Sequence, residues 1–310
     1  IDDLENLDEP EISDSEKEIQ FRYQEFEILT KKSDSEINID TDFLKVKNVT
    51  ECLKNEDVDF TDYFDRIMRI DNMKITTAQL DFSRVEPADA DAEDMEPKNI
   101  FRSNLEDVKA YPVVENYGEG IFFSFNPTKI AEFLDHETNF LSEWSDKLDE
   151  INYDNFSRTA VEFGKHQNWP LYLIHTFSHL VMRELEFRCG YPTASLSERI
   201  YVSNEKKYKM YGCLIYTSEG AEGSMGGLIA QTKSNNLTNL ISSALKRATI
   251  CNSDPLCWES EGQGLFDLNF ASCFSCSLVS ETSCELRNIY LDRKLIIDED
   301  HGYFKKITPK

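Results

Sequence analysis

The spacing of apolar residues along the chain predicts several helices. Helices are expected at residues 21–29, 139–163 and 236–250, the first of them on the helical spacing of its apolar groups. A further segment, residues 171–187, is apolar around most of its circumference, so we expect a central, buried helix there. Pro170 suits the first helical position and Gly190 suits the C-terminal cap, which places the ends of this helix.

Extended segments are expected between these helices. Strands are predicted at residues 75–85, 200–203 and 212–217. Residues 111–125 are expected to form two strands joined at Gly118 and Gly120, because glycine favours tight turns. An acidic segment flanked by prolines, residues 86–97, is expected to be a loop. With helices and strands mixed along the chain and no internal repeat, the predicted fold class is α+β (mixed α/β).

Length and hydropathy limit the class of protein. The chain has 310 residues, enough to bury one large core or two moderate ones. It begins at Ile1 rather than Met, which indicates a piece of a longer protein. Its apolar runs are all shorter than the ~18 residues that span a bilayer. We therefore expect a soluble, cytoplasmic protein without a membrane partner.

The formal charge of −25 is concentrated in the first half of the chain. Residues 1–170 hold 42 acidic and 18 basic residues, a net charge of −24, whereas residues 171–310 hold 16 and 15, a net charge of −1. Such an acidic surface repels phosphate, so the first half is a poor candidate for binding nucleic acid by itself. The basic clusters of the second half, Lys206–Lys209 and Lys246–Arg247, are short, and an ordinary solvated surface is favoured over a DNA groove.

Five of the eight cysteines lie within 34 positions in the last third of the chain. Cys273 and Cys276 form a CxxC pair whose sulfurs can reach one metal ion from a single tight turn, and Cys251 and Cys257 can supply two more ligands. Four thiolates suit the tetrahedral zinc ion, which would hold together a loop that is poor in apolar residues. Disulfides are the alternative for a secreted protein, but we find no signal-peptide or transmembrane pattern. The single cysteines are expected to be buried thiols: Cys52, Cys189 and Cys213.

Two other motifs can carry chemistry. His175 and His179 are four residues apart and share one helix face, as the histidines of metal-binding HExxH helices do. That motif needs a Glu after the first histidine and Thr176 stands there, so a pair of core or interface histidines is favoured. Residues 218–228 hold four glycines within eight positions and can present backbone N–H groups to an anion. The loop lacks the Lys-Ser/Thr of a P-loop, and a tight turn with close packing is an equal alternative.

A set of short motifs occurs in a distinctive order along the chain. They are HTFSH (175–179), CGYPTASLSERIY (189–201), SEGAEGSMGGL (218–228), CNSDPLC (251–257), ASCFSC (271–276), TSCE (282–285) and NxxLDR (288–293), preceded by FRYQEFEIL (21–29), ITTAQLDFSRVEP (75–87) and YPVVENYGEGIFFSF (111–125). In this order they resemble the DrmB family, a component of the DISARM anti-phage defence system of bacteria and archaea. The part beyond residue 166 carries the stronger resemblance and is also similar to the zinc-binding domain of MrfA-type DNA-repair helicases.

The resemblance implies partners and ligands. DrmB-like proteins act with DrmA, a separate helicase subunit, so the implied partners are a DrmA-like helicase and DNA, the DNA mainly through the complex. By the family motif the zinc ligands are Cys251, Cys257, Cys273 and Cys276, with Cys284 as the substitute if one of the four is not a ligand. Further motif positions are implied to be structural rather than catalytic: His175, His179, Glu219, Gly226, Gly227, Asp292 and Arg293.

These observations divide the chain into three expected parts: an acidic linker or tail at 1–20, an acidic mixed α/β region at 21–165, and a DrmB/MrfA-like zinc-binding module at 166–310. The module is expected to combine a central buried helix, a small sheet and a four-cysteine zinc loop. No Walker motif or nuclease carboxylate cluster is visible, so the predicted function is a non-catalytic accessory subunit of an anti-phage defence complex that pairs with a helicase to engage foreign DNA. Two alternatives stay open: a hydrolase or nuclease that uses His175, His179 and Glu219, and a protein scaffold that does not touch DNA.

Overall fold

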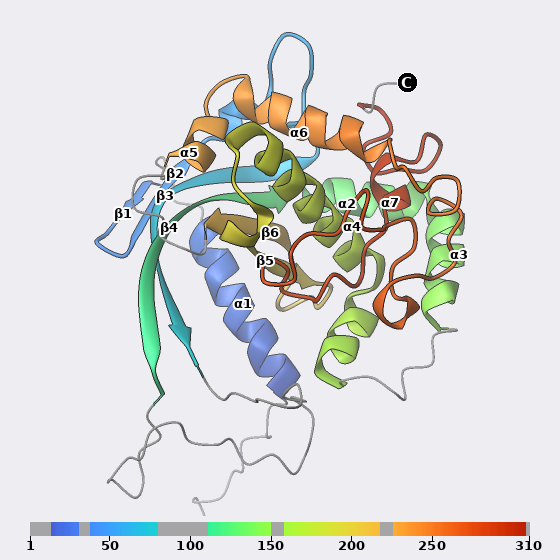
Figure 1. Ribbon diagram of the computed structural model, residues 1–310, viewed down its shortest axis with the longest axis horizontal. Helices are drawn as coiled ribbons and strands as arrows, with labels where there is room; N and C mark the ends of the chain where they lie inside the picture. Colours follow the sequence, from blue (N-terminus) through green and yellow to red (C-terminus); the bar gives the residue numbers. More distant parts are fainter. Residues whose placement is uncertain (1–13, 31–37, 80–110, 150–157, 218–225, 308–310) are drawn as a thin grey trace, which may run out of the picture.

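A six-stranded antiparallel sheet forms the centre of the molecule (Figure 1). The computed structural model describes residues 14–30, 38–79, 111–149, 158–217 and 226–307. The strands are β1 (Asn38–Asp40), β2 (Leu44–Asn48), β3 (Phe64–Ala78), β4 (Val113–Phe125), β5 (Leu196–Ser203) and β6 (Met210–Thr217), and their order in the sheet is β1-β2-β3-β4-β6-β5. The expected α+β class is confirmed, and so are the strands at 200–203 and 212–217.

Helices cover both faces of this sheet (Figure 1). They are α1 (Asp14–Thr30), α2 (Pro127–His136), α3 (Thr138–Asp149), α4 (Arg158–Cys189), α5 (Gly227–Gln231), α6 (Asn236–Ala248) and α7 (Lys294–Ile297), with 3-10 turns η1 (Thr50–Leu53), η2 (Thr193–Ser195) and η3 (Leu265–Asp267). The helix expected at 139–163 corresponds to α3 and the start of α4, with residues 150–157 between them outside the described part. Most of the chain after α6 is irregular, and it packs along α4, from Tyr172, whose ring stacks on Phe270, to Arg183, which donates to the carbonyl of Phe274.

Side chains alternate across β4, as the two-residue period of a strand requires. Phe123 and Phe125 point into the main core, where their ring centroids lie 5.3 and 5.2 Å from that of Phe177 in α4. Phe122 points to the other face and contacts Phe26 of α1 at 5.8 Å. The sheet therefore has a large core against α4 on one face and a smaller one under α1 on the other.

β4 also joins the two halves of the sequence. It pairs with β3 on one side and with β6 on the other, so that Phe122 lies between Met68 and Leu214. A single sheet therefore runs across the expected boundary at residue 165, and the division into modules at that position stays a prediction.

The buried helix expected from Pro170 onward is the second segment of α4. The backbone leaves the helical region at Asn168 (φ 52°, ψ −147°), and the side-chain oxygen of Asn168 accepts a hydrogen bond from the N–H of Trp169 at 2.6 Å. The helix ends at Gly190, whose positive φ of 71° suits glycine and whose N–H donates to the carbonyl of Glu186 at 3.0 Å. The predicted C-terminal end is confirmed, and the break at Asn168 places the start of this segment at Trp169, one residue before the predicted first position, Pro170.

The expectation of two strands at 111–125 is wrong, because β4 runs through both glycines without a turn. A Cβ added at Gly120 would lie 2.9 Å from the carbonyl oxygen of Ile215 in β6, and one at Gly118 would meet the carbonyl of Thr217. These glycines therefore allow β4 and β6 to approach closely, which is the other reason for glycine inside a strand.

The expected tail at 1–20 is wrong over its last seven residues, which belong to α1. Ile19 is 5% exposed and packs with Tyr23 and Phe26 against the smaller core, so the apolar face of the helix begins earlier than its acidic sequence indicates. Residues 1–13 lie outside the described part of the chain. The strand expected at 75–85 is confirmed for Ile75–Ala78 in β3. Residues 80–85 and the expected acidic loop at 86–97 lie outside the described part of the chain.

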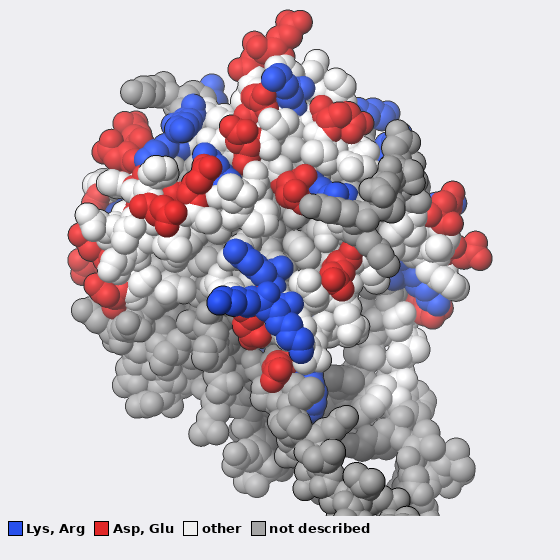
Figure 2. Space-filling view, turned by 180° about the vertical axis from the view of Figure 1, so that it is seen from behind, with Lys and Arg blue, Asp and Glu red and all other residues white. Residues whose placement is uncertain are grey.

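Charged side chains are unevenly distributed on the back of the molecule. Figure 2 shows one compact group of basic side chains near the middle of this face, with acidic groups scattered around it. In the turn between β5 and β6, Lys206, Lys207 and Lys209 are exposed, as expected for a solvated basic cluster. Among the helices that the structure describes, none combines the length and the apolar character needed to cross a membrane.

Candidate metal centre

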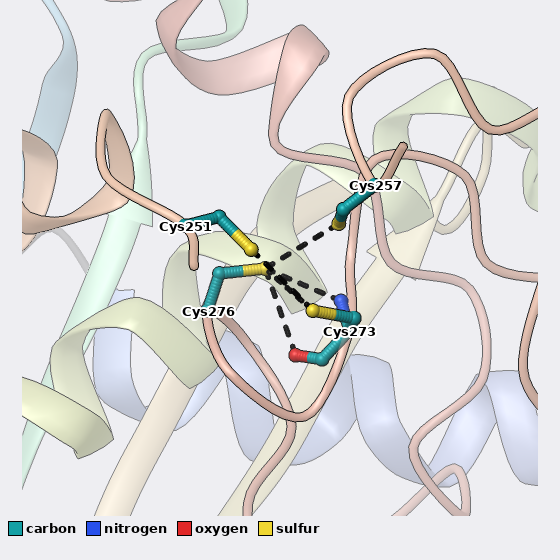
Figure 3. A group of neighbouring side chains, drawn as sticks. All are labelled: Cys251, Cys257, Cys273 and Cys276. Carbon is teal, nitrogen blue, oxygen red and sulfur yellow. Dashed lines mark hydrogen bonds between the residues drawn. The ribbon is translucent and has the colours of Figure 1, made fainter. Parts of the chain in front are cut away.

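The four cysteines that the sequence singles out converge from two loops that follow α6. Figure 3 shows their side chains pointing toward one another. Each pair is brought in by a tight turn: the N–H of Asp254 donates to the carbonyl of Cys251 at 3.2 Å, and the N–H of Cys276 donates to that of Cys273 at 3.1 Å. Cys257 and Cys276 are buried, while Cys251 and Cys273 are partly exposed.

The spacing of the four sulfurs fits a tetrahedral metal. Sγ–Sγ distances are 3.5 Å for Cys251 and Cys273, 3.9 Å for Cys257 and Cys276, and 3.8 Å for Cys273 and Cys276, and all four sulfurs lie within 4.8 Å of one another. A zinc ion with metal–sulfur bonds of about 2.3 Å requires sulfur–sulfur edges of about 3.8 Å. A disulfide requires about 2.05 Å, so these separations fit metal ligands and not bonded pairs.

The thiolate is the form of cysteine that binds metal, and Cys273 is the sulfur that this environment favours as a thiolate. Burial raises the pKa of Cys273, but hydrogen bonds from Cys251 and from the backbone of Ser275 outweigh it and lower that pKa to about 6. Burial and the neighbouring Cys276 sulfur raise the pKa of Cys257 well above its ordinary value. Four thiolates at this spacing repel one another, and a divalent cation is the group that relieves that repulsion.

Arg293 connects the two cysteine loops from beneath. Its guanidinium is fully buried and donates to the carbonyls of Ala248 and Ala271 at 2.7 and 2.9 Å, and to the carboxylate of Asp254 at 2.9 Å. The same group lies 3.7 Å from the sulfur of Cys257. Arg293 was expected to be structural, and its contacts make it a positioning residue for the cysteine cluster, because groups that hold metal ligands in place also set metal affinity.

Two large apolar side chains stand at the tips of the cysteine loops. Leu256 precedes Cys257 and is 83% exposed, and Phe274 follows Cys273 and is 82% exposed. Arg183 of α4 donates to the carbonyls of Phe274 and Ser275 at 3.2 and 3.1 Å, which fixes the backbone beneath the second tip. Each loop therefore exposes one apolar side chain to solvent, and Arg183 holds the backbone of the second loop in place.

The described end of the glycine-rich segment, residues 226–228, is held by an internal carboxylate. Glu119 of β4 is fully buried and accepts hydrogen bonds from the N–H of Gly226 at 2.8 Å and from that of Leu228 at 2.9 Å. Tyr191 donates its hydroxyl to the same carboxylate at 3.2 Å. These two amides are therefore already paired with an anion supplied by the protein. Glu219, one of the residues in the hydrolase alternative, lies outside the described residues.

His175, His179 and Cys284 come together at a different place. Each lies in a second buried group, and the fourth member is Glu198 of β5. Cys284, the expected substitute ligand, is therefore placed beside the histidines and not with the other four cysteines. Glu198 was not predicted from the sequence. This residue belongs to the same inward-facing series of the strand as Leu196 and Ile200, and a carboxylate in such a series indicates a buried polar site.

Comparisons with known proteins agree with this geometry. Residues 177–277 match the domain family described as the MrfA Zn-binding domain, a range that includes all four clustered cysteines. The chain is 35% identical over 241 residues to the DISARM protein DrmB of Bacillus paralicheniformis; the match covers 77% of this chain and 42% of that protein. The chain thus spans less than half the length of this relative. Zinc is the cofactor that both the matched domain and the four sulfurs support.

Proposed function

This chain is a homologue of the DISARM protein DrmB, and on that premise we propose that it is a non-catalytic subunit of an anti-phage defence complex, which pairs with a DrmA-like helicase to engage foreign DNA. The observation that carries the proposal is the 35% identity over 77% of the chain, together with the zinc-binding domain inside the matched range. The whole complex would work in the cytoplasm, where phage DNA enters.

Within this proposal, one zinc ion is bound by Cys251, Cys257, Cys273 and Cys276. The ion would be structural, because four protein ligands leave no open position for a water or substrate. Its role is to hold two irregular loops in one shape, with Arg293 fixing them from below. Leu256 and Phe274 would then each offer an exposed apolar side chain for contact.

The environment of the histidines supports a subunit without its own catalytic site. His175 and His179 are each 0% exposed, so neither ring lies at a surface that a substrate can touch. At the described end of the glycine-rich segment, the amides of Gly226 and Leu228 donate to Glu119, so these two amides are not open to a phosphate. Both features disfavour the hydrolase or nuclease alternative.

The charge of the chain supports DNA contact through the complex. The first 170 residues carry a net charge of −24, and each phosphate contact requires a cation. The apolar tips at Leu256 and Phe274 suit contact with the partner or with an unpaired base, since aromatic rings stack on bases without regard to sequence. Positive surface would come mainly from the helicase subunit.

The decisive experiment is a salt titration of DNA binding by the isolated chain and by the chain assembled with the helicase subunit. We expect binding by the assembly, with a steep loss of affinity as salt rises, and none by the isolated chain at physiological salt. Tight binding by the isolated chain would identify an autonomous DNA binder. Assembly without any DNA binding would favour the scaffold alternative.

A matched pair of variants locates the contact surface. Phe274→Ala removes the exposed ring at the zinc loop, and Val113→Ala removes an exposed apolar side chain at the start of β4, away from the cysteines. We expect Phe274→Ala to weaken assembly or DNA binding by about tenfold, the size of one lost stacking contact. Val113→Ala is expected to leave both unchanged.

A further inference from the structure

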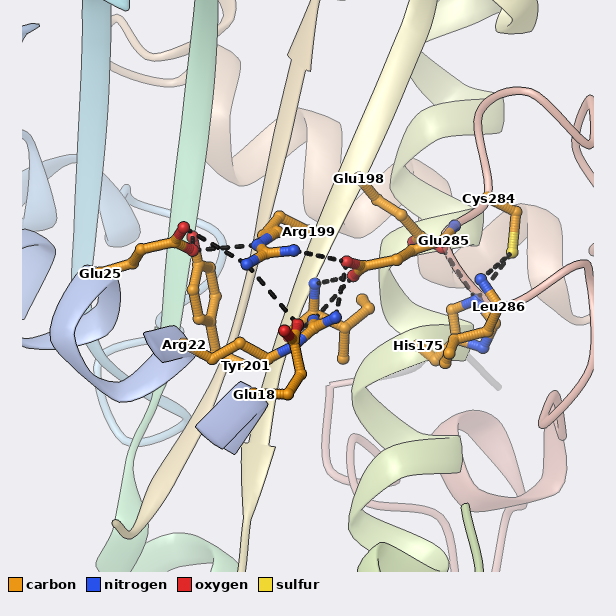
Figure 4. Close-up of polar contacts among 11 residues, drawn as sticks. Glu18, Arg22, Glu25, His175, Glu198, Arg199, Tyr201, Cys284, Glu285 and Leu286 are labelled. Atoms are coloured by element: carbon orange, nitrogen blue, oxygen red, sulfur yellow. Dashed lines mark hydrogen bonds and ion pairs between the residues drawn. The ribbon is translucent and has the colours of Figure 1, made fainter. Parts of the chain in front are cut away.

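A second cluster of metal-binding side chains lies inside the protein. His175 and His179 come from successive turns of α4, Glu198 comes from β5, and Cys284 comes from the irregular segment beyond the four-cysteine loops. Figure 4 shows His175, Glu198 and Cys284 of this group. The two histidines and Glu198 are at most 4% exposed, and Cys284 is 8% exposed. One ligand atom from each lies within 4.8 Å of the others. Three separate parts of the fold therefore meet at this point.

The distances between these atoms are those of a coordination sphere. His175 Nε2 lies 2.9 Å from Glu198 Oε1 and 3.2 Å from Cys284 Sγ. His179 Nε2 lies 3.4 Å from the same Glu198 oxygen. A tetrahedral zinc ion with nitrogen and oxygen ligands at about 2.0 Å and sulfur at about 2.3 Å requires edges of about 3.3 to 3.5 Å. These three separations are within a few tenths of an ångström of that spacing.

The outer contacts orient each ligand inward. His175 Nδ1 lies 3.3 Å from the carbonyl of Tyr290, and His179 Nδ1 lies 3.0 Å from the carbonyl of Ser277. A carbonyl only accepts, so both Nδ1 atoms carry the proton, and both Nε2 atoms face the cluster. Metal-bound histidines have this arrangement, in which the outer nitrogen donates to a carbonyl and the inner one holds the metal.

Cys284 and Glu198 show the complementary pattern. The sulfur of Cys284 accepts the backbone N–H of Leu286 at 3.3 Å and that of Asn288 at 3.1 Å, contacts that stabilise a thiolate. Glu198 Oε2 is buried without a hydrogen-bond partner, and the 3.4 Å contact of His179 Nε2 with Glu198 Oε1 does not form a hydrogen bond. Unpaired buried polar atoms are uncommon and costly, so their presence here indicates a missing ligand.

The charges show what kind of ligand is missing. The carboxylate of Glu198 lies 2.9 Å from His175 Nε2 and the sulfur of Cys284 lies 3.2 Å from it, so two groups that can carry negative charge face the same point. Two protons would make two imidazolium rings whose centroids are 4.4 Å apart in a dry interior, where like charges repel strongly. A divalent cation instead balances one carboxylate and one thiolate and leaves both rings neutral.

We propose that His175, His179, Glu198 and Cys284 form a second zinc site, distinct from the four-cysteine centre. Two imidazoles, a thiolate and a carboxylate are a ligand set that zinc accepts, whereas calcium and magnesium require oxygen ligands. Four protein ligands in a buried position make the site structural. It joins α4, β5 and the C-terminal segment, and the carbonyl of Ser277 connects it to the CxxC pair one residue earlier.

The test uses the full chain purified without chelator. We expect about two zinc ions per chain by elemental analysis. Zinc X-ray absorption should then show about 2.5 sulfur and 1.5 nitrogen or oxygen neighbours per ion, the average of a four-sulfur site and a mixed one. One zinc per chain with sulfur neighbours alone would overturn the proposal and identify the cluster as a protonated network. This measurement needs no variant, so it holds even if the site is required for folding.

Variants then assign the second ion. Cys284→Ser and His179→Gln are each expected to reduce zinc from two ions to one and to leave only sulfur neighbours around the ion that remains. Cys213→Ser is the control, because Cys213 is fully buried and belongs to neither cluster. Unchanged zinc content in folded Cys284→Ser would contradict the assignment. DNA binding and assembly are not part of this readout, so its failure is distinguishable from failure of the proposed function.

Discussion

Arg22 and Glu285 form a bidentate ion pair across 263 positions of sequence. The two guanidinium nitrogens of Arg22 lie 2.9 and 2.8 Å from the two carboxylate oxygens of Glu285 (Figure 4). Arg22 is 7% exposed, and its Nη1 also donates to the carbonyl of Ile200 in β5. The pair fastens α1 to the residue that follows Cys284, so an acidic helix near the start of the chain supports the candidate second metal site near its end.

Breaking this pair should destabilise the protein. Arg22→Met is expected to lower the free energy of unfolding by about 2–4 kcal/mol, because the Glu285 carboxylate loses one of its positively charged partners. A double-mutant cycle with Glu285→Gln should give a coupling of about 1–3 kcal/mol in denaturant unfolding. Lys54→Met, which breaks the exposed pair with Asp59, is the control and should have a much smaller effect. Strictly additive losses would contradict direct coupling.

Zinc binding by the four-cysteine centre can be tested at a single ligand. Cys273→Ser should remove one zinc ion per chain and lower the melting temperature, because the chain between α6 and α7 has one short 3-10 turn and no strand to hold its shape without the metal. Cys52→Ser should leave the zinc content unchanged, since Cys52 lies in neither cluster. Elemental analysis and thermal unfolding provide the measurement. Equal zinc in both variants would show that Cys273 is not a ligand.

Arg293 should control how tightly that zinc is held. The Arg293→Lys substitution keeps the positive charge. The lysine ammonium cannot reproduce the planar guanidinium, which donates to Ala248, Ala271 and Asp254 at the same time. We expect the variant to release zinc to a chelator about 10 to 100 times faster. Arg247→Lys is the control, because the Arg247 guanidinium pairs with Glu184 and does not contact the cysteines. This variant should release zinc at the wild-type rate. Equal rates for both variants would remove Arg293 from the metal site.

Gly120 should be intolerant of any side chain. Gly120→Ala places a Cβ 2.9 Å from the carbonyl of Ile215, so β4 and β6 must separate, at an expected cost of about 2–3 kcal/mol in the free energy of unfolding. At Gly190 a Cβ meets no atom within 4 Å, and only the positive φ of 71° opposes it. Gly190→Ala should therefore cost about 1 kcal/mol. Urea denaturation compares the two, and the reverse order would contradict the close approach of the strands.

Glu137 should contribute to acid sensitivity. Burial raises the pKa of Glu137, but hydrogen bonds with Lys305 and His301 outweigh it and lower the pKa below the ordinary 4.5. A carboxyl whose pKa is lower in the folded state stabilises the fold above its unfolded pKa and loses that effect as pH falls through its folded pKa. Melting temperatures of Glu137→Gln should therefore depend less on pH below about 4.5 than those of the wild type. Glu132→Gln, at an exposed pair with Lys129, should show the wild-type dependence.

Several features follow from the sequence alone because they depend on local spacing. The end signals Pro170 and Gly190 act within one helical turn, and a CxxC turn places Cys273 and Cys276 together whatever surrounds it. The mixed α+β class, the buried helix and the set of four clustered cysteines were predictable for this reason. The family resemblance was readable from the same short motifs.

Other features depend on which segments meet in space, and only the tertiary structure decides that. Gly118 and Gly120 read as turn residues until β6 is placed beside β4, because a turn and a close backbone approach both require glycine. Glu198 and Cys284 lie 86 positions apart, and neither local pattern indicates the other. They become neighbours of His175 only when β5 and the C-terminal segment pack on α4, since long-range contacts are set by the burial of apolar faces and not by local sequence.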